Sequence, residues 1–139
     1  MKISKILPSR LDVIPDFLSE VVSHLQKNQI EGQKIFEIRL CLEEALANAI
    51  MHGNKLDEKL SVTASMTIGS ECIEIDVEDQ GQGFDLESVE DPTSEKNLCK
   101  LSGRGVFLIK EQMDKVNFFD GGRRLKMIKF LKEESSCGN

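Results

Sequence analysis

The sequence of 139 residues contains no tryptophan and no tyrosine, and its seven phenylalanines are scattered along the chain. A platform of aromatic side chains on which nucleic-acid bases could stack is therefore not evident. Basic residues are also in the minority, because 18 Lys and Arg stand against 24 Asp and Glu and give a formal net charge of −6. A negatively charged surface repels a phosphodiester backbone. We therefore expect no direct nucleic-acid partner.

The chain also lacks long hydrophobic runs. None of its uncharged apolar stretches could span a bilayer, and its N-terminus shows neither the apolar core nor the cleavage site of a secretory signal. A cytoplasmic protein without membrane contact is the expectation. No two of the four cysteines form a Cys-x-x-Cys metal or redox pair. We expect them to be small buried residues, and we predict no zinc site.

The length, with 40% hydrophobic and 30% charged residues, fits one globular domain over residues 1–139. The spacing of apolar residues predicts the elements of this domain. In chain order they are an edge strand at 2–7, helices at 14–25 and 33–52, a strand hairpin at 60–68 and 73–77, a helix at 106–113 and a second hairpin at 115–119 and 125–131. This order predicts an α+β fold, a two-layer sandwich in which helices cover one face of a mixed, mostly antiparallel sheet.

Three polar residues lie four positions apart on the long predicted helix. Glu44, Asn48 and His52 therefore share one face of it, beside the apolar stripe. A carboxylate and a carboxamide so placed can accept a proton and ligate a hard cation through oxygen. Glu43 is the competing carboxylate, but it lies about 100° round the helix from Glu44. Such polar spacing is also common on solvated helix faces, and His52 fits equally well as a brace of the site or as a helix-end cation.

Two glycine-containing motifs follow. Residues 79–83 read Asp-Gln-Gly-Gln-Gly directly after a predicted strand, where an Asp can accept a hydrogen bond from an amine and the glycines permit close approach of a ligand. Residues 102–105 read Ser-Gly-Arg-Gly and open a predicted helix, whose free N–H groups suit a phosphate. Each motif alone also fits an ordinary turn. Neither the Rossmann fingerprint nor the P-loop pattern is matched.

Taken in order, the three motifs are more specific than any one of them. Glu44-x-x-x-Asn48, Asp79-x-Gly81-x-Gly83 and Gly103-x-Gly105 resemble the N, G1 and G2 boxes of the GHKL superfamily of ATP-binding domains. Within it, the sequence is most similar to the bacterial anti-sigma factor serine/threonine kinases, over about residues 8–131. The resemblance implies the Bergerat α/β sandwich, which agrees with the predicted order of elements.

The resemblance also implies roles for individual residues. Glu44 would be the general base that takes a proton from a serine or threonine hydroxyl. Asn48 would ligate the Mg²⁺ that bridges the ATP phosphates. Asp79 would bind the adenine amine. Gly81 and Gly83 would let the chain pass close to the nucleotide.

The last motif is assigned to the phosphates in the same way. By position the resemblance places Ser102, Gly103, Arg104 and Gly105 in the nucleotide site, and residues of about 85–102 would form the ATP lid. For Arg104 the residue itself leaves open a phosphate contact, a protein contact or simple solvation. The short lid is typical of the anti-sigma group. A sensor histidine kinase is not expected, since no phosphoacceptor helix precedes the domain.

The function that the resemblance implies is an ATP- and Mg²⁺-dependent serine/threonine-protein kinase, which phosphorylates a STAS-domain anti-anti-sigma protein, sequesters a sigma factor, or does both. A homodimer is a further arrangement found in the group. The alternative is a non-catalytic ATP-binding module that only sequesters a sigma factor or another regulator. A chaperone or mismatch-repair ATPase is the weaker hypothesis, because those chains carry large additional domains.

Overall fold

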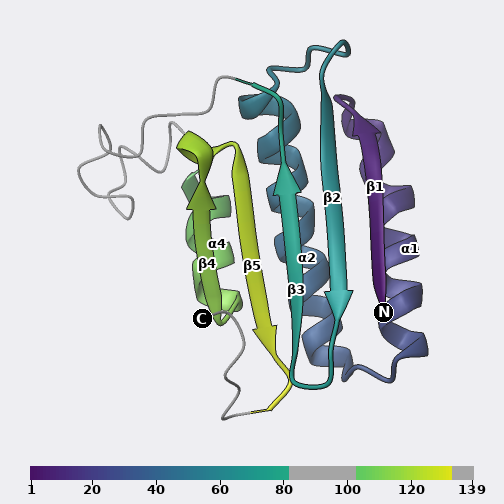
Figure 1. The fold of residues 1–139 in the computed structure, drawn as a ribbon. Coiled ribbons are helices and arrows are strands. Elements are labelled where there is room, and N and C mark those ends of the chain that lie inside the picture. Colours follow the sequence, from purple (N-terminus) through teal and green to yellow (C-terminus); the bar gives the residue numbers. More distant parts are fainter. Residues whose placement is uncertain (82–102, 133–139) are drawn as a thin grey trace.

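The computed structural model describes residues 1–81 and 103–132. In that part of the chain five strands form one sheet in the order β1-β2-β3-β5-β4, and three α-helices lie against one of its faces (Figure 1). The elements are β1 (Lys2–Pro8), α1 (Ile14–Lys27), α2 (Gly32–Asn48), β2 (Ser61–Ile68), β3 (Cys72–Glu78), α4 (Gly103–Gln112), β4 (Lys115–Phe119) and β5 (Arg124–Phe130). All four pairings between these strands are antiparallel. The predicted α+β sandwich is thereby confirmed.

Alternation along the central strands gives the sheet one apolar face. In β2, Ala64 and Met66 are buried while their neighbours point to the other side. The register places Ala64 opposite Val77 and Met66 opposite Ile75, so the buried residues of β2 and β3 lie on the same face. On the helix side of the core, α1 and α2 each bury five residues, and those of α2 are Ile38, Cys41, Leu42, Ala45 and Leu46. Within the described ranges, no helix is both long and apolar enough to cross a membrane.

The long helix ends differently from the prediction. We expected a regular helix as far as His52, but α2 ends at Asn48 and a π-helical turn follows over Ala49–Gly53. The backbone N–H of Asn54 closes this turn by donating to the carbonyl of Ala49 at 2.8 Å. A π-turn is rare and often occurs at a functional site, because it widens the helix and changes the direction of its side chains.

Candidate functional site

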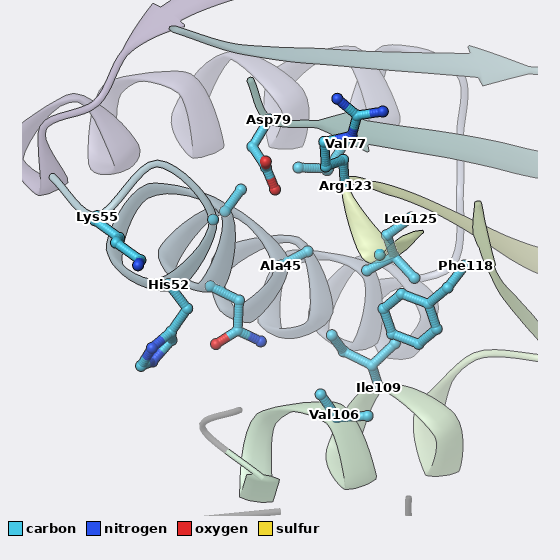
Figure 2. A pocket seen from close by; sticks show the side chains of 14 residues that line it. Ala45, His52, Lys55, Val77, Asp79, Val106, Ile109, Phe118, Arg123 and Leu125 are labelled. Carbon is cyan, nitrogen blue, oxygen red and sulfur yellow. The ribbon is translucent and has the colours of Figure 1, made fainter. Parts of the chain in front are cut away.

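A cavity of about 260 Å³ lies between the C-terminal end of α2, the end of β3, the start of β5 and helix α4 (Figure 2). Much of its wall is apolar and comes from Ala45, Ala49, Val77, Val106, Ile109, Phe118 and Leu125. Its polar lining residues are Asn48, His52, Lys55, Asp79 and Arg123. A flat apolar group with a polar edge fits such a cavity, because the walls exclude water and a few polar groups fix its orientation.

Asp79 is the buried acidic group of this cavity, with 7% of its surface exposed. Its Oδ1 accepts a hydrogen bond from the backbone N–H of Gly81 at 2.9 Å, and Figure 2 shows the carboxylate pointing into the cavity. Burial raises the pKa of Asp79, although the Gly81 amide and the charge of Arg123 oppose this rise. An ionised carboxylate can accept several hydrogen bonds, so the bond from Gly81 leaves acceptor capacity for an amine inside the cavity.

Two glycines bring the end of the π-turn against the Asp79 loop. A β-carbon on Gly81 would overlap the backbone oxygen of Gly53, and a β-carbon on Gly53 would overlap the Asp79 carboxylate. Gly81 is one of the predicted site residues, whereas Gly53 belongs to none of the predicted motifs. Its place beside the carboxylate depends on a contact between segments 26 positions apart, which motif spacing does not reveal.

We expect Gly81→Ala to lower the free energy of unfolding by about 1–3 kcal/mol, because the added methyl group meets backbone atoms that cannot rotate away. Urea unfolding of the purified protein measures this loss. Gly32→Ala is the matched control, since Gly32 opens α2 with no atom within 4 Å of its added β-carbon. The control should be neutral or stabilising. Equal unfolding curves for the two variants would contradict this packing.

Asn54 supports the segments that carry the site, and sequence reasoning missed it. Its side chain is 1% exposed, and its Nδ2 donates to Ser9 Oγ at 2.8 Å and to the carbonyl of Ser61 at 3.0 Å. Its Oδ1 accepts from the backbone N–H of Gln80 at 2.8 Å. One carboxamide thus joins the end of the π-turn to the residue after β1, to the first residue of β2 and to the residue after Asp79. These bonds hold the end of the π-turn against its neighbours.

The other end of the site is formed by α2 and α4. A β-carbon on Gly105 would lie 2.5 Å from Glu44 Oε2 and 3.5 Å from Asn48 Nδ2, so the first turn of α4 lies against this face of α2. Glu43 points elsewhere and its carboxylate is 4.0 Å from Arg39 Nη1, in an exposed pair on the helix surface. Of the two adjacent glutamates, only Glu44 meets the glycine motif.

The structure thus brings the predicted residues into two clusters joined by one cavity. Glu44, Asn48 and Gly105 form the first, while Asp79 and Gly81 form the second. Asn48 and Asp79 both line the cavity. Gly103 and the backbone of Arg104 belong to the first turn of α4. Gly83, Ser102, the Arg104 side chain and the predicted lid at 85–102 lie outside the described residues.

Within this site a hard cation could be ligated by the side-chain oxygen of Asn48. Among residues 1–81 and 103–132, no group of three or more His, Cys, Asp or Glu side chains could hold a metal ion. Backbone N–H groups at the start of α4 could donate to an anionic ligand.

Comparison with known proteins gives a consistent result. A family described as the histidine kinase-like ATPase domain matches residues 7–129. The serine-protein kinase RsbW of Listeria monocytogenes serovar 1/2a is 28% identical over 109 residues, which cover 73% of this chain and 69% of the relative. The protein of the same name from Listeria innocua serovar 6a has the same identity and coverage. That from Staphylococcus epidermidis is 28% identical over 113 residues, 76% of this chain and 71% of the relative.

Proposed function

This chain belongs to the histidine kinase-like ATPase domain family, and we propose that it is an ATP- and Mg²⁺-dependent serine/threonine-protein kinase of the anti-sigma factor type. The observation that carries the proposal is the contact of Gly105 with Glu44 and Asn48, at the edge of the cavity that contains Asp79. This contact supports the proposal, because it brings a carboxylate, a carboxamide and the first turn of α4 together. The similarity to proteins named serine-protein kinase supports the same reaction.

In this proposal the adenine ring occupies the apolar part of the cavity. Val77 and Leu125 lie on the sheet side, and Ile109 lies on the α4 side. Asp79 accepts a hydrogen bond from the exocyclic amine, while Gly81 keeps the loop close enough for the carboxylate to reach it. A guanine ring would present an oxygen at this position, which an ionised carboxylate repels. The site is therefore expected to prefer adenine nucleotides.

The phosphates extend from the cavity toward the first turn of α4. The N–H groups at Gly103 to Gly105 donate to them, and the partial positive charge of the helix end favours the anion. Asn48 would hold Mg²⁺ together with the phosphates, and the ion, when bound, neutralises charge that develops during transfer. Glu44 then takes the hydroxyl proton of a serine or threonine. The hydroxyl oxygen bonds to the γ-phosphorus, the bond from that phosphorus to the bridging oxygen breaks, and ADP leaves.

The partners in the proposal are a STAS-domain anti-anti-sigma protein as phosphate acceptor and a sigma factor that the kinase can sequester. Both come from the family resemblance, and the names of the relatives add only that those proteins are serine-protein kinases. We further propose that residues 1–139 form one domain, that residues of about 85–102 close over the nucleotide, and that the protein acts in the cytoplasm. The net charge of −6 agrees with a protein partner rather than a nucleic acid.

The experiment that tests this function uses the purified chain, labelled ATP, Mg²⁺ and STAS-domain proteins encoded by the same genome. We expect one acceptor to gain label on serine or threonine, and removal of Mg²⁺ by a chelator to abolish transfer. Binding of ATP without transfer to any acceptor would favour the non-catalytic module instead. Failure to bind ATP or ADP at millimolar concentration would contradict both functions.

A further inference from the structure

Lys129 is a buried lysine at a position where the strand pattern calls for an apolar residue. Along β5 the residues Leu125, Met127 and Lys129 lie opposite Val77, Ile75 and Ile73 of β3, whose side chains form the core. Lys129 therefore faces the helix layer, and only 6% of its surface is exposed. A lysine is rarely buried to this degree unless its charge is paired.

The ammonium group of Lys129 has two partners, and they belong to two different helices. It lies 2.7 Å from Glu37 Oε1 of α2 and donates to the carbonyl oxygen of Gln112 at 2.5 Å. Gln112 is the last residue of α4. Burial alone would raise the pKa of Glu37, but the hydrogen bond and the charge of Lys129 outweigh this effect and lower it. Glu37 is therefore a carboxylate held in its charged form.

Glu37 lies on the same helix as the candidate site residues of α2. Glu44 follows it by seven residues and Asn48 by eleven, so all three lie on one stripe of the helix. Gly105 and Gln112 are also seven residues apart on α4, and seven residues of helix are about 10 Å long. One end of α4 thus lies at Glu44, while its other end is bonded to Lys129, the partner of Glu37.

We propose that Lys129 and Glu37 form a positioning clamp that fixes the axial register of α4 along α2, and with it the distance between the phosphate-binding turn and Glu44. This inference rests on the proposed function. A slide of about 1 Å between the helices would move the phosphates relative to the base, and a misplacement of that size can cost about 100-fold in rate. In the proposed function Asp79 holds adenine from the position after the end of β3, and it does not depend on the clamp in the same way.

Stability alone does not explain a pair of this kind. Removing two charges from water is costly, and well-packed apolar residues of similar size often replace a buried ion pair without loss of stability. The double variant Lys129→Met with Glu37→Met therefore distinguishes an effect on the stability of the fold from an effect on the axial register of α4 along α2. It keeps the volume of both side chains and leaves no unpaired charge.

We expect the double variant to unfold within a few degrees of the wild type, while its rate of transfer at saturating ATP falls about 10- to 100-fold. The KM for ATP should change by no more than about threefold, because adenine binding is retained. Isothermal titration gives a second measurement that needs no acceptor. The preference of the wild type for ATP over ADP should shrink in the variant, since the γ-phosphate loses its aligned N–H groups.

The control is another lysine–glutamate pair of the same strand, on the opposite face of the sheet. Lys126 Nζ lies 3.9 Å from Glu74 Oε1, and both side chains are partly exposed. Lys126→Gln with Glu74→Gln should leave the rate and both affinities unchanged. Lys129→Arg, which retains a charge at the clamp, should keep more activity than Lys129→Met.

A double variant with wild-type turnover and wild-type preference for ATP over ADP would overturn the clamp while leaving the proposed function intact. If the wild type binds nucleotide but transfers phosphate to no acceptor, the ratio of the ATP and ADP affinities still tests the clamp. If the wild type binds no nucleotide, both proposals fail. Should the double variant fail to fold, Lys129→Met with Glu37→Gln provides the same comparison, because it also removes both charges and leaves neither of them unpaired.

Discussion

Glu44→Gln is expected to slow phosphoryl transfer by about 100- to 10,000-fold, which is the usual contribution of a general base. The glutamine keeps the size of the side chain but cannot accept the hydroxyl proton. Nucleotide affinity should stay within about threefold of the wild type, because adenine is held at the other end of the cavity. Initial rates of label transfer at saturating ATP measure the first effect, and titration with ADP measures the second.

Glu44 is the candidate general base because of its position between α2 and α4. Its carboxylate meets Gly105 at the start of α4, where the helix dipole also favours a negative charge. Removing that charge should cost only about 0.3–1 kcal/mol of stability. A large loss of rate with a small loss of stability therefore separates a chemical role for Glu44 from a structural one.

Glu43→Gln is the matched control for this experiment. It changes the adjacent residue in the same way but removes only an ion pair with Arg39 on the helix surface. The side chains of Arg39 and Glu43 are 51% and 49% exposed. Such pairs contribute little to stability, so rate and unfolding should both stay near the wild type. If Glu43→Gln abolished transfer and Glu44→Gln did not, the assignment of the base would be reversed.

The sequence was sufficient for most of the fold because its periodic segments are long. The alternation from Val62 to Ile68 and the helical spacing around Leu42 predict elements that the structure reproduces within a few residues. Pro8 marks β1 as an edge strand, and β1 indeed lies at one edge of the sheet. These features are local, and local patterns need no knowledge of distant contacts.

The site was less accessible to sequence reasoning wherever a residue acts through distant partners. Asn54 belongs to none of the predicted motifs, and its role in the fold comes from side-chain bonds to Ser9, Ser61 and Gln80. Lys129 is an exception to the apolar pattern of β5, and its partner Glu37 is 92 positions away. No spacing rule connects such residues, because the pairing exists only after the sheet and helices have assembled.

Asp79→Asn is expected to weaken ATP and ADP binding by about 10- to 150-fold, which corresponds to the roughly 1.5–3 kcal/mol of a hydrogen bond to a charged group. Asparagine can still accept the Gly81 N–H through its oxygen, so the loop should keep its shape. Its amide nitrogen, however, is a donor and would face the donor amine of adenine. The variant thus changes the recognition of the adenine amine and leaves the loop structure largely intact.

Thermal unfolding with and without nucleotide measures this loss. At an ATP concentration about 100 times the dissociation constant of the wild type, ligand binding stabilises the wild type by about 2.7 kcal/mol. A 100-fold weaker variant would gain only about 0.4 kcal/mol under the same conditions. A full shift of the unfolding temperature in Asp79→Asn would mean that adenine is not anchored at this carboxylate.

Without nucleotide, the same substitution should leave stability unchanged or raise it near neutral pH. Burial raises the pKa of Asp79 above its ordinary value of 3.8, so the ionised group costs free energy in the folded state. Because the pKa of Asp79 is higher in the folded state than in the unfolded chain, its contribution to the free energy of unfolding is complete at pH values below the unfolded-state pKa. That contribution is lost as the pH rises through the folded-state pKa. The advantage of Asp79→Asn should therefore appear above that window and disappear in acid. A carboxylate kept at a cost to stability, in the cavity that would hold the adenine, is what a binding function requires and a purely structural function does not.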